Sequence, residues 1–477
     1  MDIKSLKDKI LQLAIQGKLV SQDENDEPAS VLLEKIKAEK EQLIKDKVIK
    51  KERTLSDISE DEKSFDLPKG WEWCRLGKAT ICRDGDRVPV SSKEREDRAK
   101  IYDYYGASGV IDKIDDYLFD KPLLLIGEDG ANLISRSTPI AFIAYDKYWV
   151  NNHAHVIDSL EFITLKYLEI YINAIDLKSF VTGTAQPKLN QANLNQIPIM
   201  LPPLEEQERI VAKVDELFEL IDELDSNKQE LLENIFNIKN KVLQLAIQGK
   251  LVEQCEDDEP ASLLLERIKA EKEQLIKDKV IKKEKPLPDI SEEEKLFKTP
   301  SSWEWCRLGN ISNIVMGQSP DSSTVSDVEG GIEFHQGKAS FGKVFINNSG
   351  LYCTKPSKIA IPDDILLSVR APVGTLNITD RELCIGRGLV AIRKYIHIEN
   401  KFFYYFTMAL EEELVKKSTG TTFKAVASTA IKEFLIPLPP LEEQNRIVAK
   451  IDLIMDYLDK LQQEIESQEI ILKDILQ

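Results

Sequence analysis

The sequence has few of the residues on which catalytic and extracellular proteins often depend. Its 477 residues include 4 histidines and 6 cysteines, and no two cysteines form a CxxC pair. We therefore expect neither structural zinc nor a disulfide framework, and we expect a reduced, cytoplasmic protein. No apolar run approaches the roughly 18 residues of a membrane span, and the N-terminus lacks the pattern of a secretory signal.

Motifs of the common nucleic-acid enzymes are missing as well. No G-x-x-x-x-G-K-[ST] occurs, which excludes a P-loop ATPase. The LPPLEEQ segments have two prolines but lack the flanking acid or amide and the aromatic ring of an amino-methyltransferase loop. PDISEEEK resembles a nuclease PD…ExK pattern, but its short polar spacer cannot place the acidic residues on adjacent strands. No local Ser/His/Asp or Cys/His signature is present, so we expect no catalytic residue in this chain.

Only the segment NNHAHV suggests a metal-binding site, and the indication is weak. His153 and His155 stand two residues apart, as two ligands on one face of a strand would. No acid or thiol accompanies them at ligand spacing. An ordinary polar strand or loop is the favoured interpretation, and no metal is expected.

What the sequence does contain is a long internal repeat. QLAIQGKLV occurs at 12–20 and again at 244–252, an offset of 232 residues that also relates the DEPAS segments and the two WEWCRLG motifs. The LPPLEEQ segments repeat at an offset of 237. Between these shared parts the copies are unlike, so one duplicated frame carries two different inserts. The predicted divisions are an N-terminal rod segment, DEPAS helix and linker (1–65), a first insert (66–201), a central helix (202–252), a second DEPAS helix and linker (253–297), a second insert (298–438) and a C-terminal helix (439–477).

The frame is predicted to be a coiled coil. Apolar residues follow one another at steps of four and three, which is the heptad pattern. The seam consists of Ile210, Val214, Leu217, Ile221, Leu224, Leu231 and Ile235 in the central helix and Ile447, Ile451, Ile454 and Leu458 in the C-terminal helix. Such narrow stripes need a partner, and the two-fold repeat implies an antiparallel pair. The N-terminal segment continues the seam where the C-terminal helix stops, so head and tail together replace one rod of a closed pattern.

Two further parts of the frame have structural interpretations. The WEWCRLG segments are expected to anchor each insert to the frame with Trp and Leu inward, and Cys74 and Cys306 there to be buried and inert. The DEPAS helices have a thin apolar stripe and many Lys and Glu residues. Either a solvated arm or a partner-contact helix fits them, and the solvated arm is favoured.

Each insert is predicted to be a compact α/β module. Strand-like apolar runs are followed by a helix, a Gly-Thr loop and a last strand before the proline pair. The chain has a net charge of −18, but the inserts hold 16 basic against 19 acidic residues and 16 against 14. The negative charge therefore lies mainly in the frame, and each insert could present a basic patch. The fold class is α/β, with two modules separated by an antiparallel coiled coil in a pseudo-two-fold, circular repeat.

The chemistry left to the inserts is the reading of DNA. Arg and Lys bind guanine edges, Asn and Gln pair with adenine, and glycine turns approach phosphates. On Gly-containing loops the candidates are Asn132, Arg136, Gln186, Lys188 and Asn190 in the first insert and Gln336, Lys338, Arg370, Arg387 and Lys424 in the second. Each of them alone also fits a solvated surface residue.

In this combination the sequence resembles the DNA-specificity subunits of type I restriction-modification systems. The LPPLEEQxRIVAK start of each rod, its LAIQGKLV end, the WEWCRLG entry and the doubled layout are typical of that family. The resemblance covers essentially the whole chain. It implies that each insert is a target-recognition domain that reads one half of a bipartite site in double-stranded DNA, with the rods holding the two domains at a fixed separation.

The resemblance also implies partners. Two modification subunits, which bind S-adenosylmethionine and methylate adenine, would attach to the frame, and restriction subunits dependent on ATP and Mg²⁺ would complete the nuclease. No cofactor is expected in this chain. Two alternatives stay open: a coiled-coil scaffold without sequence-specific readout, and a self-contained methyltransferase-endonuclease, which would need motifs that this chain lacks.

Overall fold

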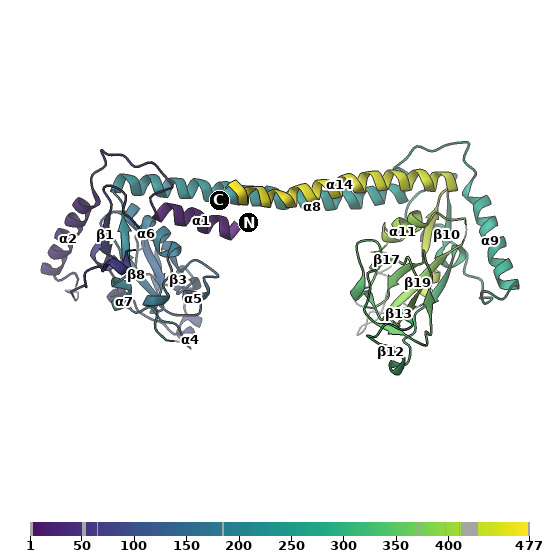
Figure 1. Cartoon of the computed structure of the whole chain (residues 1–477), viewed down its shortest axis with the longest axis horizontal. Coiled ribbons are helices and arrows are strands. Elements are labelled where there is room, and N and C mark those ends of the chain that lie inside the picture. Colours follow the sequence, from purple (N-terminus) through teal and green to yellow (C-terminus); the bar gives the residue numbers. More distant parts are fainter. Residues whose placement is uncertain are drawn as a thin grey trace. The chain divides into compact units, whose positions relative to one another are not determined.

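The chain folds into two compact units, each built on the same plan. The computed structural model describes residues 3–49, 54–63, 65–183, 186–370, 373–395, 397–409, 411 and 428–475, with side chains described to Ser467 in the last helix. One unit comprises Met1–Lys228 with Glu469–Gln477, and the other comprises Gln229–Gln468 (Figure 1). Each unit contains one insert, one arm helix and a pair of long helical segments. The predicted α/β class and internal repeat are confirmed, and we call the inserts module 1 (66–201) and module 2 (298–438).

Module 1 is made of two sheets and a covering helix, α6 (Phe162–Ala174). The four-stranded sheet has the order β2 (Ile81–Cys82), β8 (Ala154–Asp158), β5 (Leu123–Gly127), β6 (Ala141–Ala144). The three-stranded sheet has the order β4 (Gly109–Ile114), β3 (Tyr102–Gly106), β7 (Tyr148–Val150). Four short helices occur in the connections along the chain: α3 (Leu76–Ala79), α4 (Ser92–Glu96), α5 (Asn132–Ser135) and α7 (Gln191–Asn195).

The central strand β5 explains why these layers form. All five of its residues are buried. Leu124 and Ile126 pack in the cluster that includes α6, whereas Leu123 and Leu125 pack with Tyr148 of the second sheet. A continuous apolar run therefore serves a strand that is covered on both faces.

Module 2 repeats this layering with different strands. A four-stranded antiparallel sheet has the order β11 (Ser312–Met316), β19 (Leu389–Lys394), β16 (Ile365–Ser368), β17 (Leu376–Ile378). A five-stranded sheet has the order β12 (Val325–Ser326), β14 (Tyr352–Cys353), β13 (Ile332–His335), β18 (Leu383–Ile385), β15 (Ile359–Ala360). The covering helix is α11 (Asn400–Ala409), and two short helices, α10 (Leu308–Ile311) and α13 (Ser428–Lys432), contact each other. Phenylalanines 402, 403 and 406 of α11 are fully buried, which fixes the helix on its sheet.

Each module is closed by a pair of antiparallel strands that we call its stem. In module 1, β1 (Glu72–Arg75) pairs with β9 (Pro198–Leu201), so that Glu72 is opposite Leu201. In module 2, β10 (Glu304–Arg307) pairs with β20 (Leu435–Leu438) in the same register. Trp71 and Trp303 are each 4% exposed and Leu76 and Leu308 are buried. The prediction that WEWCRLG anchors the module edge is confirmed.

The cysteines of the stems are buried, as predicted. Cys74 and Cys306 are each less than 5% exposed. Burial raises the pKa of Cys74 to about 12 and also raises the pKa of Cys306. Both thiols are therefore protonated at neutral pH, and a protonated, inaccessible thiol is a poor nucleophile.

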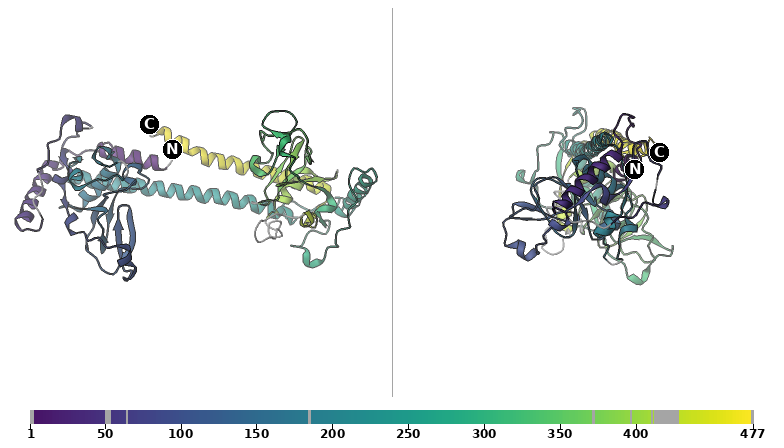
Figure 2. Two further views of the ribbon diagram at one scale, coloured as in Figure 1. Left: turned by 90° about the horizontal axis from the view of Figure 1, so that it is seen from below. Right: turned by 90° about the vertical axis from the view of Figure 1, so that its left-hand side faces the viewer.

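The long helices form an antiparallel pair within each unit. The helices are α1 (Ile3–Ile15), α8 (Leu204–Ile247) and α14 (Leu441–Ile475). In the first unit α1 lies along α8, with Lys7 2.6 Å from Asp222 and Gln22 3.3 Å from Glu206 (Figure 2). In the second unit α14 lies along α8, with Lys239 2.8 Å from Asp459 and Gln254 2.6 Å from Glu443. Ile3 at the start of α1 and Ile475 at the end of α14 both belong to the first unit, as the closed pattern predicts.

The predicted seam is buried over most of its length. Ile210, Val214, Ile221, Ile235, Ile447, Ile451 and Leu458 are each at most 7% exposed, and Leu217 and Ile454 are partly buried. Leu224 and Leu231 are instead 59% and 49% exposed. These two leucines flank the boundary between the units at Lys228. The heptad pattern identifies the apolar face of a helix, but burial also needs a partner side chain opposite the same turn.

The DEPAS segments form one arm helix in each unit. These are α2 (Ala29–Lys45) and α9 (Ala261–Lys277), and each begins directly after a proline. Three residues of each arm are buried against the neighbouring module: Ala29, Leu32 and Ile36 in α2, and Ala261, Leu264 and Ile268 in α9. Within the described residues, no helix is long and apolar enough to cross a membrane.

A buried tryptophan–glutamate hydrogen bond joins each stem to its long helix. The Trp71 indole donates to Glu206 at 2.8 Å, and the Trp303 indole donates to Glu443 at 2.8 Å. Glu443 is fully buried and Glu206 is 1% exposed, and burial raises the pKa of both carboxyl groups. The acids of the LPPLEEQ segments therefore have a structural function at the start of the helix.

We predict that Trp303→Phe destabilises the second unit by about 1–3 kcal/mol, because a buried acceptor loses its donor. Trp71→Phe should destabilise the first unit by a similar amount, since the geometry is the same. Urea unfolding followed by circular dichroism measures both. Trp73→Phe is the control for ring size, because Trp73 donates no hydrogen bond from its indole within the described residues. Equal losses in all three variants would contradict the prediction.

Candidate nucleic-acid interface

In module 1 the structure brings together the two loops that carry the predicted DNA contacts. One follows β5 and contains α5, and the other is the Gly-Thr loop, Thr182–Asn190, of which residues 184 and 185 are outside the described part. The Leu189 amide donates to Glu128 O at 2.7 Å, and the Gly130 amide donates to Pro187 O at 3.1 Å. The loops thus form one continuous surface beyond the end of β5.

The predicted contact residues of module 1 differ in how free their side chains are. The Arg136 guanidinium donates to the carbonyls of Ile172 and Ile175 at the end of α6. Asn132 accepts from Ser137 and Thr138 within its own loop, and Asn190 caps α7 by accepting from the Asn193 amide at 2.9 Å. Gln186 is exposed, and Lys188 is 51% exposed although its amine lies 3.1 Å from Glu128. The structure therefore leaves Gln186 exposed and Lys188 half-exposed with one ion pair to Glu128, whereas the side chains of the other three shape the loops.

Three turns of module 2 meet in a comparable way. Gln336 and Lys338 follow β13, Arg370 follows β16, and Arg387 lies between β18 and β19. The Gly388 amide donates to Gln336 O at 3.2 Å, and the Val369 amide donates to Gly388 O at 3.0 Å. A side chain at Gly388 would place its Cβ 2.5 Å from Gln336 O. Only glycine at this position therefore allows the turn after β18 to lie this close to the turn after β13.

The approach leaves two arginines beside one glutamine on the surface of module 2. Arg370, Arg387 and Gln336 are all exposed. Gln336 accepts from the Ser319 hydroxyl at 3.0 Å, and the Lys338 amine lies 3.3 Å from Thr375 Oγ1. Lys424 lies outside the described residues. Arginine and glutamine are the side chains that make paired hydrogen bonds with guanine and adenine.

Beneath the surface of module 1 lies a buried network of charges that the sequence did not reveal. His155 is fully buried, with Nδ1 2.6 Å from Asp84 Oδ2 and Nε2 2.7 Å from Leu189 O. Arg87 lies between the two carboxylates, 3.2 Å from Asp84 and 2.8 Å from Glu128. The one signal in the sequence is that His155 stands between Ala154 and Val156, in a segment that the structure shows as the buried strand β8.

This network has the composition of a metal site but already satisfies its own polar groups. The ligand atoms of Asp84, Glu128 and His155 lie within 4.8 Å of one another. Both imidazole nitrogens are, however, occupied by hydrogen bonds, and the Arg87 guanidinium stands where a cation would neutralise the carboxylates. The residues therefore fit a buried ion network better than a metal site. His153 lies in the turn before β8 and forms a separate pair with Asp129 at 2.8 Å, as the polar-loop alternative predicted, whereas the strand that holds His155 is buried rather than polar.

The hydrogen bonds also fix the orientation of the His155 ring. A backbone carbonyl only accepts, so Nε2 carries a proton. Burial alone would raise the pKa of Asp84, but the hydrogen bond from His155 and the charges of His155 and Arg87 lower it. The Asp84 carboxylate also bonds the Val156 amide at 2.9 Å, so one side chain holds both the ring and the backbone of β8. Through Leu189 the His155 ring fixes the Gly-Thr loop to β8.

The sequence and the fold together define a class of protein. The family described as type I restriction modification DNA specificity domain matches twice, over residues 68–234 and 300–472. Each match covers one module and most of the long helix that follows it. The chain belongs to the type I restriction-modification DNA-specificity family, and the resemblance inferred from the repeat is confirmed.

Particular relatives match almost the whole chain. It is 30% identical to the EcoAI specificity subunit of Escherichia coli, over 96% of this chain and 90% of that protein. It is 29% identical to the EcoEI specificity subunit of Escherichia coli, over 98% and 91%.

Solved structures show the same fold. The HsdS subunit from Thermoanaerobacter tengcongensis matches with a TM-score of 0.51 and 26% identity, over 87% of this chain and 98% of that chain. A structure that describes complex assembly and conformational transition of the type I R-M system matches with a TM-score of 0.54 and 27% identity, over 86% and 97%.

We predict that Asp84→Asn destabilises module 1 by about 3–5 kcal/mol, because it leaves the Arg87 guanidinium buried without its full counter-charge. The Leu189 amide should then exchange hydrogen faster, which hydrogen–deuterium exchange measures. The wild-type stabilisation is present above about pH 4, the ordinary pKa of Asp, and is lost as the pH falls through the lowered folded-state value. The difference between wild type and variant should therefore shrink in acid.

Asp86→Asn is the matched control for this substitution. Asp86 lies two residues after Asp84, is 49% exposed and pairs with Arg83. An exposed ion pair contributes only about 0–1 kcal/mol to stability. If the two variants lost equal stability, the buried network would not hold the loop.

Proposed function

We propose that each module reads one half of a bipartite site in double-stranded DNA. The observation that supports this most is that one set of frame contacts, repeated residue by residue, carries two unlike loop surfaces. Trp71 and Trp303, for example, make the same bond at the same distance. The surfaces above them present Gln186 and Lys188 in one module and Arg370 and Arg387 in the other. A shared frame with different readers suits a target whose two halves differ in sequence.

The proposed readout is direct hydrogen bonding to base edges. Gln186 would pair with adenine and Arg370 and Arg387 with guanine, whereas Lys188 would bind guanine or phosphate. Asn132, Arg136 and Asn190 would act on DNA mainly by shaping the loops, because their side chains already bond to the module. Each good bidentate contact contributes roughly 1–3 kcal/mol to discrimination between bases.

The long helices are proposed to set the spacing of the half-sites and to dock two modification subunits. The seam residues support this, because a coiled coil is a stiff element whose length is fixed by its residue count. The modification subunits would bind S-adenosylmethionine and methylate adenine, and restriction subunits with ATP and Mg²⁺ would join through them. The present chain would then be a non-catalytic subunit without a cofactor of its own.

We predict that the purified chain transfers no methyl group to DNA without its modification subunits. Incubation with labelled S-adenosylmethionine and DNA, followed by scintillation counting, tests this. Adding the modification subunits to the same sample should restore transfer, which controls for inactive DNA or donor. Methyl transfer by the chain alone would contradict the non-catalytic assignment.

We also predict that exchanging one module changes one half-site. Residues 78–182 would be replaced by the corresponding segment of a related subunit, which leaves Trp71, the stem and the seam unchanged. Sequencing of methylated bases in cells should show a new sequence for one half-site, with the other half and the spacer kept. A matched exchange in module 2 should change the other half only.

The outcome that would contradict this assignment is a change in both halves, or in the spacer alone. A complex that assembles and binds DNA with no sequence preference would instead favour the scaffold alternative.

A further inference from the structure

The outer surfaces of the two arms are unusually alike. Residues 36–52 and 268–284 are identical in sequence, and most of them are exposed where described. Exposed positions of the long helices have changed between the copies, as Glu208 and Asn445 or Leu220 and Tyr457 show. Surface substitutions usually alter stability by less than about 0.5 kcal/mol. Folding alone therefore does not explain why the arms kept the same surface.

Each arm is fastened to its own module. The Lys40 amine donates to Gly77 O at 2.6 Å and Thr80 O at 2.9 Å, and the Lys272 amine donates to Gly309 O at 2.6 Å. At the start of the arms, the Ala29 amide donates to Gly70 O and the Ala261 amide donates to Ser302 O. The free end of each arm is consequently fixed relative to the module beside it.

The free end of each arm contains a lysine where geometry favours glycine. After α9 the Val280 amide donates to Leu275 O at 2.9 Å and the Lys279 amide donates to Ile276 O at 3.1 Å, which is a Schellman turn. Lys279 has φ +59°, and Lys47 in the equivalent turn after α2 has φ +61°.

The same chain uses glycine at two comparable helix ends. Gly17 and Gly249 follow α1 and α8 with φ +67° and +68°. A left-handed conformation is unfavourable for any residue with a Cβ atom. Retention of lysine in both arms, at a position where the chain elsewhere places glycine, indicates that the lysine side chain itself is needed.

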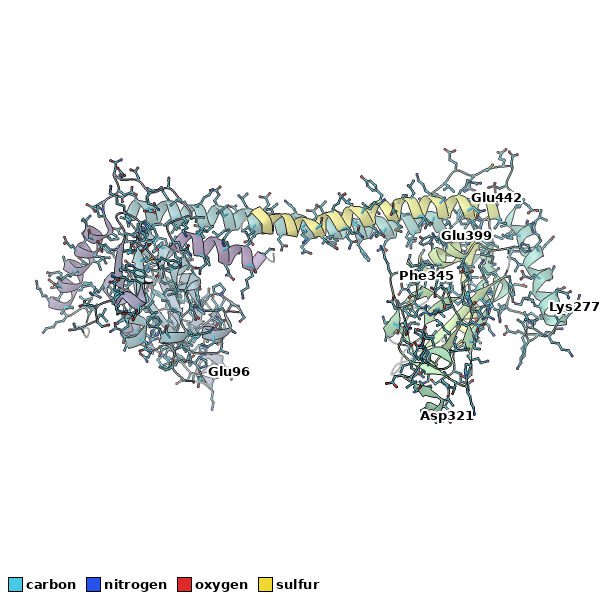
Figure 3. The ribbon with its side chains drawn as sticks, viewed as in Figure 1. Glu96, Lys277, Asp321, Phe345, Glu399 and Glu442 are labelled. Atoms are coloured by element: carbon cyan, nitrogen blue, oxygen red, sulfur yellow. The ribbon has the colours of Figure 1, made fainter. Side chains whose placement is uncertain are left out.

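The tip of the second arm is strongly basic. Five exposed lysines lie within nine residues, and none forms an ion pair within the described residues: Lys277, Lys279, Lys282, Lys283 and Lys285. Of the acids among them, Asp278 accepts from Gln274 and Glu284 pairs with Lys432. Figure 3 shows Lys277 at the free end of α9.

We propose that the two arm tips bind the sugar–phosphate backbone of double-stranded DNA, each beside the half-site that its module reads. This rests on the function proposed above. Lysine supplies sequence-independent phosphate contacts, whereas it is depleted in protein–protein interfaces. The modules differ because the half-sites differ, but the backbone is the same everywhere. An identical surface on both units fits that uniform part of the ligand.

Salt dependence of DNA binding tests the proposal directly. Lys277, Lys279, Lys282 and Lys283 would be changed to Gln in the full chain, assembled with its modification subunits. The slope of the logarithm of the DNA-binding constant against the logarithm of salt concentration is negative. Its magnitude should decrease by about 0.9 for each phosphate contact removed. Affinity for target and non-target duplexes should fall together, and the methylated sequence should stay the same. Changing the same four residues to Arg keeps the charge and should preserve the slope.

A single substitution separates binding from folding. Lys279→Gly removes the backbone strain and the charge together, so it should raise the melting temperature while lowering affinity for DNA. A residue with only a structural function would not change these two quantities in opposite directions. Lys47→Gly should behave in the same way in the first unit.

An unchanged salt slope in the four-Gln variant would overturn the proposal, even if the complex methylates its target normally. Loss of modification subunits on size-exclusion chromatography, again with an unchanged slope, would make the tip a protein-docking surface and would also overturn it. Failure of the wild-type complex to prefer any sequence would refute the proposed function instead.

Discussion

The buried Glu206 and Glu443 carboxylates are the points on which each unit depends. Glu206 accepts hydrogen bonds from Trp71 and from Gln22, which follows α1. Glu443 accepts them from Trp303 and from Gln254, which follows α8. In each unit the module, the long helix and the segment after the earlier helix therefore meet at one side chain. A carboxylate in the interior is unfavourable unless donors surround it. The helix N-terminus adds a further favourable field for the negative charge. The buried carboxylate needs all of its donors in place, so it fixes the positions of the three elements relative to one another within each unit.

Around this point the frame repeats in detail. Arg209 pairs with Asp26 and Arg446 with Asp258, each at 2.6 Å. Arg75 and Glu62 have their counterparts in Arg307 and Glu294. The modules follow no such rule: the first has a three-stranded second sheet and the second a five-stranded one. Constraint is concentrated where module and helix meet, and it is relaxed where DNA would be read.

Much of this division could be predicted from the sequence, because the repeat itself separates frame from inserts. Heptad spacing predicted burial correctly at positions such as Ile210 and Ile451, since a regular helix fixes which side chains share a face. It did not predict the exposure of Leu224, which depends on what lies opposite that turn.

The loops were less predictable. Arg136 has the right chemistry for guanine, yet its guanidinium binds carbonyls at the end of α6. The partners of His155 come from segments about 30 and 70 residues away, a pairing that depends on tertiary contacts. Residue type indicates what a side chain is able to bind, and only the folded backbone decides which group it reaches.

The stems have a consequence for how such chains diversify. Because the entering and leaving strands of a module are hydrogen-bonded neighbours, the module begins and ends at almost the same point in space. Its internal length can then change without moving the helices, since lengthening a closed segment costs entropy only slowly, about 0.6 kcal/mol per doubling. The inside of a module can therefore change while its attachment to the long helix stays the same. Natural variants can gain or lose whole strands within a module while the stem and the long helices stay the same.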